Sequence, residues 1–162
     1  MRRAIYPGTF DPITFGHLNI LTKARDLFDE VILAVANITS KNTLFSTDER
    51  LSLCNEAVQH FSKIKVEKFD GLAIRYAEAV GAKTIIRGMR AVSDFEFELQ
   101  LSLMNKNLNN DIETIFLVPD AEYLYLSSSM VKQVVGLGGS IKKYIPFCVE
   151  QAILKKFNEI NR

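Results

Sequence analysis

Five short apolar segments, separated by stretches with helical periodicity, constrain the fold of this chain more than any other feature of its sequence. They lie at residues 4–6, 31–36, 64–66, 84–86 and 115–118. Each segment has the length of one β-strand. Strands that alternate with helices are typical of parallel sheets, because neighbouring parallel strands need a long crossover connection. The pattern therefore predicts an α/β protein with an open, mostly parallel sheet of five strands.

The stretches between these segments carry apolar residues at intervals of three or four, as amphipathic helices do. One helix should begin near Ser46, because Ser46 followed three residues later by Glu49 forms the pattern of a capping box. Another should be opened by Gly71 and ended by Gly81. The remaining helices are predicted at about residues 18–28, 93–108, 127–135 and 146–158.

The composition fits one globular domain, which we predict over residues 1–162. Twenty basic and nineteen acidic residues leave a net charge of +1, so no bulk positive field is available to hold a nucleic acid or a membrane surface. The longest apolar run, residues 31–36, is far shorter than the roughly 20 residues that span a bilayer. We therefore expect neither nucleic acid nor membrane as a partner.

The chain start and the cysteines both favour a cytoplasmic protein. Arg2 and Arg3 are followed by a segment rich in proline and glycine, not by the apolar run of a secretory signal. Cys54 and Cys148 lie far apart in the sequence, each among apolar neighbours, which favours buried reduced thiols over a disulfide or a metal site.

Small and polar residues follow the first predicted strand, at the sheet edge where open parallel sheets bind ligands. Gly8 allows a tight turn and a close approach to a phosphate, and Gly16 lets a ligand lie against the helix start. Thr9 adds a hydroxyl and an amide. His17 falls in the first helical turn, where the helix dipole favours an anion. The alternative is a structural turn with a helix-capping histidine.

Other groups suited to phosphate follow later strands. Arg87 and Arg90 come after the strand at 84–86, where two guanidinium groups can hold phosphate oxygens bidentately. The serines at 127–129 open a helix, although an ordinary N-cap needs one serine and not three. Lys41 lies in a polar loop long enough to bring a charge over this edge. Exposed surface charge is the alternative for each basic residue.

Three blocks of sequence together resemble one known family. Residues 14–17 (TFGH), after 6–12 (YPGTFDP), look like the T/H-x-G-H signature of the nucleotidyltransferase superfamily. With 86–98 (IRGMRAVSDFEFE) and 126–132 (LSSSMVK), the chain resembles the bacterial phosphopantetheine adenylyltransferases over nearly its full length. The resemblance implies a Rossmann-like open parallel five-stranded sheet with helices on both faces. Phe97 stands where relatives often carry tyrosine, and Leu126 where isoleucine is more usual.

The resemblance implies transfer of the adenylyl group of ATP to 4′-phosphopantetheine, giving dephospho-coenzyme A and pyrophosphate in coenzyme A biosynthesis. The acceptor phosphate is already an anion near neutral pH, so the reaction needs no general base to make its nucleophile. It needs in-line positioning and charge stabilisation, which cations and amide donors supply. Mg²⁺ should travel with ATP, because no cluster of acidic residues suggests a dedicated metal cage. Coenzyme A is implied as a feedback ligand.

The resemblance also implies roles for individual residues. His17 is implied as the transition-state stabiliser, with Lys41 and Arg90 as the other catalytic residues. The acceptor site would consist of Thr9, Lys41, Ala73 and Arg87. The ATP site would consist of Thr9, Phe10, His17, Gly88, Met89, Arg90, Glu98, Tyr123, Leu124, Tyr125, Leu126, Ser127, Ser128 and Ser129. No residue is implied as a metal ligand.

The predicted helix at 93–108 favours a homo-oligomer, for which the resemblance suggests a hexamer. One apolar stripe consists of Phe95, Leu99 and Leu103, and a second consists of Phe97, Leu101, Met104 and Leu108. One stripe should serve the core, and the other then needs a partner chain. The alternative is a helix buried on both sides within one chain.

Two other functions stay open on the sequence. The first is a nucleotidyltransferase of the same fold that acts on nicotinamide mononucleotide or glycerol phosphate, which the block at 86–98 argues against. The second is a nucleotide-binding regulatory module without catalysis, since a fold does not imply activity. The presence of all five phosphate-site residues, Thr9, His17, Lys41, Arg87 and Arg90, argues against the second.

Overall fold

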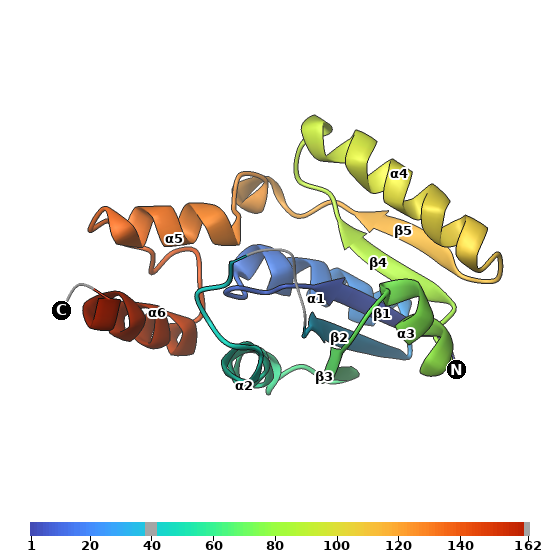
Figure 1. The fold of residues 1–162 in the computed structure, drawn as a ribbon, viewed down its shortest axis with the longest axis horizontal. Coiled ribbons are helices and arrows are strands. Elements are labelled where there is room, and N and C mark those ends of the chain that lie inside the picture. The colour runs from blue at the N-terminus through green and yellow to red at the C-terminus, as the bar shows by residue number, and fades with distance from the viewer. Residues whose placement is uncertain (38–41, 161–162) are drawn as a thin grey trace.

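The computed structural model describes residues 1–37 and 42–160, which contain one five-stranded sheet flanked by helices (Figure 1). The strand order is β3-β2-β1-β4-β5, and every neighbouring pair is parallel. The strands are β1 (Arg3–Gly8), β2 (Glu30–Ala36), β3 (Ile64–Phe69), β4 (Thr84–Gly88) and β5 (Glu113–Leu117). The predicted Rossmann-like α/β fold is therefore confirmed, and each apolar segment lies at a strand.

The helices begin and end within a few residues of their predicted positions. They are α1 (Phe15–Leu27), α2 (Thr47–Val58), α3 (Ala73–Ala79), α4 (Val92–Leu108), α5 (Ser128–Gly136) and α6 (Phe147–Ile160). A short 3-10 helix, η1 (Ala121–Tyr123), was not predicted. None of the described helices combines the length and the apolar character needed to cross a membrane.

Two core clusters lie on opposite faces of the sheet, because successive strand residues point to opposite sides. Along β1, Ala4 and Tyr6 join the larger cluster, which includes the apolar sides of α1, α2, α5 and α6. Ile5 joins the smaller cluster, in which Ile74 of α3 packs against the other sheet face. Helices therefore cover both faces, as predicted.

The predicted capping box of α2 is present. The Ser46 hydroxyl accepts a hydrogen bond from the backbone N–H of Glu49 at 3.3 Å. In return, the Glu49 carboxylate accepts one from the backbone N–H of Ser46 at 2.8 Å. These reciprocal bonds satisfy N–H groups that have no partner within the helix, and so fix its start.

Both cysteines are free thiols, as predicted. Cys54 is buried on α2, and this burial raises the pKa of its thiol to about 12. Cys148 differs from the prediction, since its side chain is only half-buried. Burial is also the main cause of the raised pKa of Cys148. Neither thiol is activated for chemistry, because the reactive form is the thiolate.

Helix α4 lies beside β5 at the edge of the sheet (Figure 1), and here one prediction is wrong. We expected one of its two apolar stripes to serve the core. Both are exposed in the single chain, with Leu99 38 %, Leu101 37 % and Phe97 61 % exposed. Among the α4 side chains that the structure describes, only Glu98 is buried. The reason is that β5 is an edge strand whose own residues are at most half-buried, so it offers α4 little apolar surface.

Candidate active site

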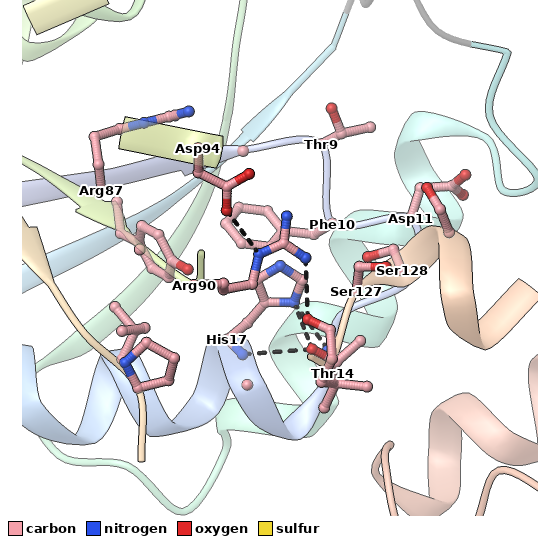
Figure 2. A pocket seen from close by; sticks show the side chains of 18 of the residues that line it. Thr9, Phe10, Asp11, Thr14, His17, Arg87, Arg90, Asp94, Ser127 and Ser128 are labelled. Carbon is pink, nitrogen blue, oxygen red and sulfur yellow. Dashed lines mark hydrogen bonds and ion pairs between the residues drawn. The ribbon is translucent and has the colours of Figure 1, made fainter. Parts of the chain in front are cut away.

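A cavity of about 800 Å³ opens at the carboxyl ends of the two central strands, β1 and β4. The chain leaves β1 toward β2 on one side and later returns to place β4 on the other side. Such a switch in strand order creates the crevice in which open α/β sheets bind ligands. The volume lies within the usual range of about 300–1,000 Å³ for small-molecule sites. Figure 2 shows side chains from all three motif blocks around this cavity.

Most of the predicted site residues line this cavity. They are Thr9, Phe10, His17, Arg87, Gly88, Arg90, Glu98, Leu126, Ser127, Ser128 and Ser129. They come from segments far apart in the sequence, and the sheet edge brings them together. The geometry therefore makes a single site of residues that the sequence could only group by resemblance.

The other predicted residues that the structure describes lie outside the cavity lining, and the roles of all the predicted site residues stay predictions. Met89 follows β4 directly, where its N–H donates to the Leu117 carbonyl at 2.9 Å. Ala73 begins α3 and packs against the smaller core cluster. Tyr123 ends η1, and Leu124 and Tyr125 follow it. Lys41 lies outside the described residues.

His17 caps its own helix. Its backbone N–H donates to the Thr14 hydroxyl, while its ring Nδ1 accepts the backbone N–H of Thr14 at 3.0 Å. Because Nδ1 accepts that bond, the single proton of the neutral ring belongs on Nε2. The capping alternative is therefore correct for Nδ1. It leaves Nε2, which bonds to none of the described residues, for a ligand.

The His17 ring is neutral at pH 7. Burial, with the nearby charge of Arg90 as a second cause, lowers the pKa of His17 to about 4. A buried cation beside a guanidinium is unfavourable, so the ring takes up a proton only in acid. At neutral pH His17 is thus a hydrogen-bond donor through Nε2–H and carries no charge.

Phe10 packs against His17. Its ring meets the His17 ring edge-on, with centroids 5.1 Å apart, and the Tyr6 ring in the same way at 5.4 Å. The backbone of Phe10 has a φ of 50°, a left-handed conformation that is uncommon for a bulky residue and that occurs often at functional sites. A Cβ at position 8 would lie 2.8 Å from this ring. We expected the small size of Gly8 to make room for a phosphate. In the structure, its small size makes room for the Phe10 ring.

Arg87 is rigidly held. Its Nε and Nη2 donate to the two carboxylate oxygens of Glu98, both at 2.7 Å, and its Nη1 donates to the Pro7 carbonyl at 3.2 Å. Burial lowers the pKa of Arg87, but the hydrogen bonds and charge of Glu98 outweigh it and leave that pKa raised. Glu98 was implied in ATP binding; here both of its oxygens bind Arg87.

Arg90 is held more loosely than Arg87. Its Nη1 donates to the Leu126 carbonyl at 3.0 Å, and its Nε lies 3.6 Å from a carboxylate oxygen of Asp94 (Figure 2). The Arg90 side chain is 41 % exposed, against 28 % for Arg87. Arg90 can therefore change its position to meet a ligand at a smaller cost than Arg87 can.

The three serines at the start of α5 differ in their contacts. The Ser127 hydroxyl caps the helix by accepting the N–H of Met130 at 3.0 Å. The Ser128 hydroxyl donates to the Pro12 carbonyl at 2.7 Å, which ties α5 to the first motif block. Ser129 also lines the cavity, and its hydroxyl bonds to no described residue. One serine is thus enough for the cap, as the sequence argument held.

Arg50 was missed by the sequence analysis, although it organises the loops behind the cavity. It is buried on α2, and its Nη1 donates to the carbonyls of Thr9 and Ala36, both at 2.8 Å. Its other N–H groups donate to the Phe45 and Asn37 carbonyls and to the Thr47 hydroxyl. The available signal was its spacing, because an arginine three and four residues before Leu53 and Cys54 lies on the buried face of the helix.

Asp11 and Lys132 were also missed. The buried Asp11 carboxylate accepts the backbone N–H groups of Leu44 and Phe45 at 2.8 and 2.9 Å. It also accepts from the Lys132 ammonium on α5 at 2.7 Å. Asp11 therefore joins three segments around the cavity. The signal was present in the motif blocks, since Asp11 lies in the first and Lys132 in the third.

The acidic side chains of the cavity do not form a metal site. Within the described parts of the chain, no three His, Cys, Asp or Glu residues come together as metal ligands could. The cavity carboxylates each pair with a basic side chain, Asp11 with Lys132, Asp94 with Arg90 and Glu98 with Arg87. Such pairs do not fit a resident divalent cation, which needs carboxylate oxygens of its own.

Comparisons with known proteins agree with this geometry. The cytidylyltransferase-like family model matches residues 5–134. A phosphopantetheine adenylyltransferase of Desulfitobacterium hafniense (strain Y51) is 52 % identical over 158 residues, 98 % of this chain and 97 % of the relative. The enzyme of the same name from strain DSM 10664 / DCB-2 is 51 % identical over the same shares of the two chains.

A solved structure supports the fold alone. A Vibrio parahaemolyticus protein assigned as a nicotinate-nucleotide adenylyltransferase superposes with a TM-score of 0.71 at 19 % identity, over 98 % of this chain and 97 % of that one. At that identity the likeness extends to the sheet and its helices and carries no argument about substrate. The family match and the close relatives go further: this chain belongs to the cytidylyltransferase-like family and, within it, to the phosphopantetheine adenylyltransferases.

Proposed function

We propose that this protein transfers the adenylyl group of ATP to 4′-phosphopantetheine, giving dephospho-coenzyme A and pyrophosphate. The observation that carries the proposal is the convergence of Thr9, His17, Arg87, Arg90 and the α5 serines on one cavity. They converge in a chain that is 52 % identical to a phosphopantetheine adenylyltransferase.

In the reaction, a phosphate oxygen of the acceptor attacks the α-phosphorus of ATP. The bond between that phosphorus and the oxygen bridging to the β-phosphorus breaks, and its electron pair leaves with pyrophosphate. The two substrates repel each other as anions, so the protein must hold them in line and offset their charge. The chemistry requires no carboxylate as a base, and the cavity carboxylates serve to hold basic side chains.

His17 is the donor to the α-phosphate in this mechanism. Its Nε2 carries the proton because Nδ1 accepts the Thr14 N–H. As a neutral donor it can stabilise charge that shifts onto the α-phosphate oxygens during transfer without binding the ground state too tightly. The positive end of the α1 helix dipole lies beside it and favours an anion.

The two arginines suit different partners. Arg87, fixed by Glu98 and Pro7, provides a preorganised cation for the acceptor phosphate, together with Lys41. Arg90 is held by fewer bonds and lies beside the start of α5, so it serves the ATP phosphates together with Ser129. Ala73, Met89, Tyr123, Leu124 and Tyr125 complete the two sites in the proposal. Mg²⁺ enters as part of the ATP substrate, held by phosphate oxygens.

We also propose that the chain works in the cytoplasm as a homo-oligomer, specifically a hexamer, with coenzyme A as a feedback ligand. The support for an oligomer is the outer surface of α4, where the large apolar side chains of Leu103 and Met104 are each 58 % exposed. Contiguous exposed apolar surface of this kind is typical of protein contacts.

The decisive test is incubation with ATP, Mg²⁺ and 4′-phosphopantetheine, followed by a pyrophosphate assay and detection of dephospho-coenzyme A by mass. Formation of both products is expected. Pyrophosphate release only with nicotinamide mononucleotide or glycerol phosphate would identify a different nucleotidyltransferase. ATP binding without turnover of any acceptor would identify a regulatory module.

A further inference from the structure

Tyr6 is a buried polar residue at the floor of the cavity that the mechanism above does not use. It lies on β1, is only 6 % exposed and lines the cavity. Its ring contacts Phe10 and lies 6.5 Å, between centroids, from the His17 ring. It begins the first motif block, residues 6–12, but neither the residue pattern nor the resemblance assigned it a role.

The Tyr6 hydroxyl has no hydrogen-bond partner among the described residues. In that part of the chain, every side-chain nitrogen or oxygen that is fully sealed from solvent does have a partner. The unpaired Tyr6 hydroxyl must therefore reach the cavity surface. A Cβ at Gly88 would lie 3.3 Å from this hydroxyl, so the glycine leaves the space beside it open. A tyrosine hydroxyl this deep normally has a partner, which points to a ligand.

The surroundings of Tyr6 favour an anionic oxygen as that partner. Burial raises the pKa of Tyr6 far above its ordinary value, although the charges of Arg87 and Arg90 oppose the shift. The phenol is therefore neutral at pH 7 and can donate its proton. A donor that feels the charge of both Arg87 and Arg90 suits a phosphate oxygen, whose negative charge those groups also attract.

We propose that Tyr6 is a further catalytic residue, whose hydroxyl donates a hydrogen bond to a non-bridging oxygen of the ATP α-phosphate. The choice of the α-phosphate follows from the sheet face. Tyr6 points to the face that carries α1, and its neighbours there, His17 and Gly88, belong to the proposed ATP site. The inference rests on the proposed function, because it assigns a contact within that reaction.

Tyr6→Phe is the direct test, because it removes one oxygen and keeps the ring that packs against Phe10. The lost bond to a charged group should lower kcat/KM about 10- to 100-fold. The fall should be similar for ATP and for 4′-phosphopantetheine, since both meet in the same transition state. The melting temperature should stay within a few degrees of that of the unaltered protein. Tyr144→Phe, a half-buried tyrosine outside the cavity lining, is the matched control and should be fully active.

ATP analogues distinguish the phosphate from the ribose as the partner. With 2′-deoxy-ATP and 3′-deoxy-ATP, the penalty of Tyr6→Phe should persist undiminished. A penalty that disappears with either analogue would place the bond on the ribose and overturn the α-phosphate assignment. Normal kinetics of Tyr6→Phe would overturn the inference while leaving the proposed function intact. Lack of turnover by the unaltered protein would overturn both.

Discussion

The charged side chains of the cavity have partners within the chain, whereas the apolar side chains on the outer surface of α4 are exposed. In the cavity, charged groups are paired before any substrate arrives, as Arg87 with Glu98 and Asp11 with Lys132 illustrate. On α4, Leu103 and Met104 are each 58 % exposed and pack against little. The difference teaches that the catalytic groups are organised within one chain, whereas the α4 surface is not yet buried by anything in that chain.

Glu98 connects the two regions. It is the buried residue on the inner side of α4, and it holds Arg87 from that position. A partner chain that covered the exposed side of α4 would therefore steady the helix that holds Arg87, the arginine proposed to bind the acceptor. The following experiments alter the cavity, the residue that joins the two regions, and the α4 surface.

The largest effect is expected at His17, within the cavity. His17→Ala removes both the Nε2 donor and the helix cap, so turnover should fall about 10²- to 10³-fold and stability by about 1 kcal/mol. His17→Gln separates the two roles, because glutamine at this helix position completes a capping box with Thr14. It should recover the melting temperature and leave turnover low. Normal single-turnover rates in a destabilised His17→Ala protein would refute the catalytic role.

A smaller effect is expected where the two regions meet. Glu98→Gln keeps the size of the side chain and weakens its hold on Arg87, so the KM for 4′-phosphopantetheine should rise about 10-fold. The KM for ATP should stay unchanged. Glu96→Gln, an exposed neighbour on the same helix, is the control. An equal rise in the KM for ATP would mean that Glu98 contacts ATP directly, as the family resemblance implied.

On α4 itself, assembly should change more than activity. A Leu103→Glu, Met104→Glu double variant places charge on the exposed surface and should shift the mass in light scattering toward the 18.3 kDa of one chain. Activity per chain should stay within about two-fold, as for surface substitutions that leave the site intact. A mass of 18.3 kDa for the unaltered protein would remove the oligomer from the proposal.

The last prediction is a pH dependence of stability. Because the pKa of His17 is about 4 in the folded state and about 6.5 when unfolded, the unfolded chain binds the proton more readily. Stability should therefore fall as the pH drops below about 6.5, with the full loss reached near pH 4. Urea unfolding between pH 7.5 and 4.5 should show a flatter profile for His17→Gln than for the exposed control His60→Gln. Identical profiles would contradict the lowered pKa.

The sequence predicted the sheet well because strand positions depend on local apolar runs. It failed on α4, since the burial of a helix face depends on what lies opposite, and β5 turned out to be an edge strand. Within the cavity, the resemblance named residues that the structure brings together, but it did not reveal what supports them. The Asp11–Lys132 pair joins positions 121 residues apart, a distance over which only the folded path of the chain determines contact. Tyr6 stood in the first motif block but received no role there, because a tyrosine in an apolar run is typical of a core.

The contacts of Arg50 bear on which amino-acid substitutions this site can accept. Four of the five groups that it binds are main-chain carbonyls, at Thr9, Ala36, Asn37 and Phe45. Every amino acid supplies such a carbonyl, so the side chains at these positions can be exchanged without the loss of a single bond to Arg50. Because Arg50 binds main-chain atoms, it can hold the loops in shape while the neighbouring side chains are substituted. Substitutions at these positions can therefore change substrate preference without changing the loop conformation.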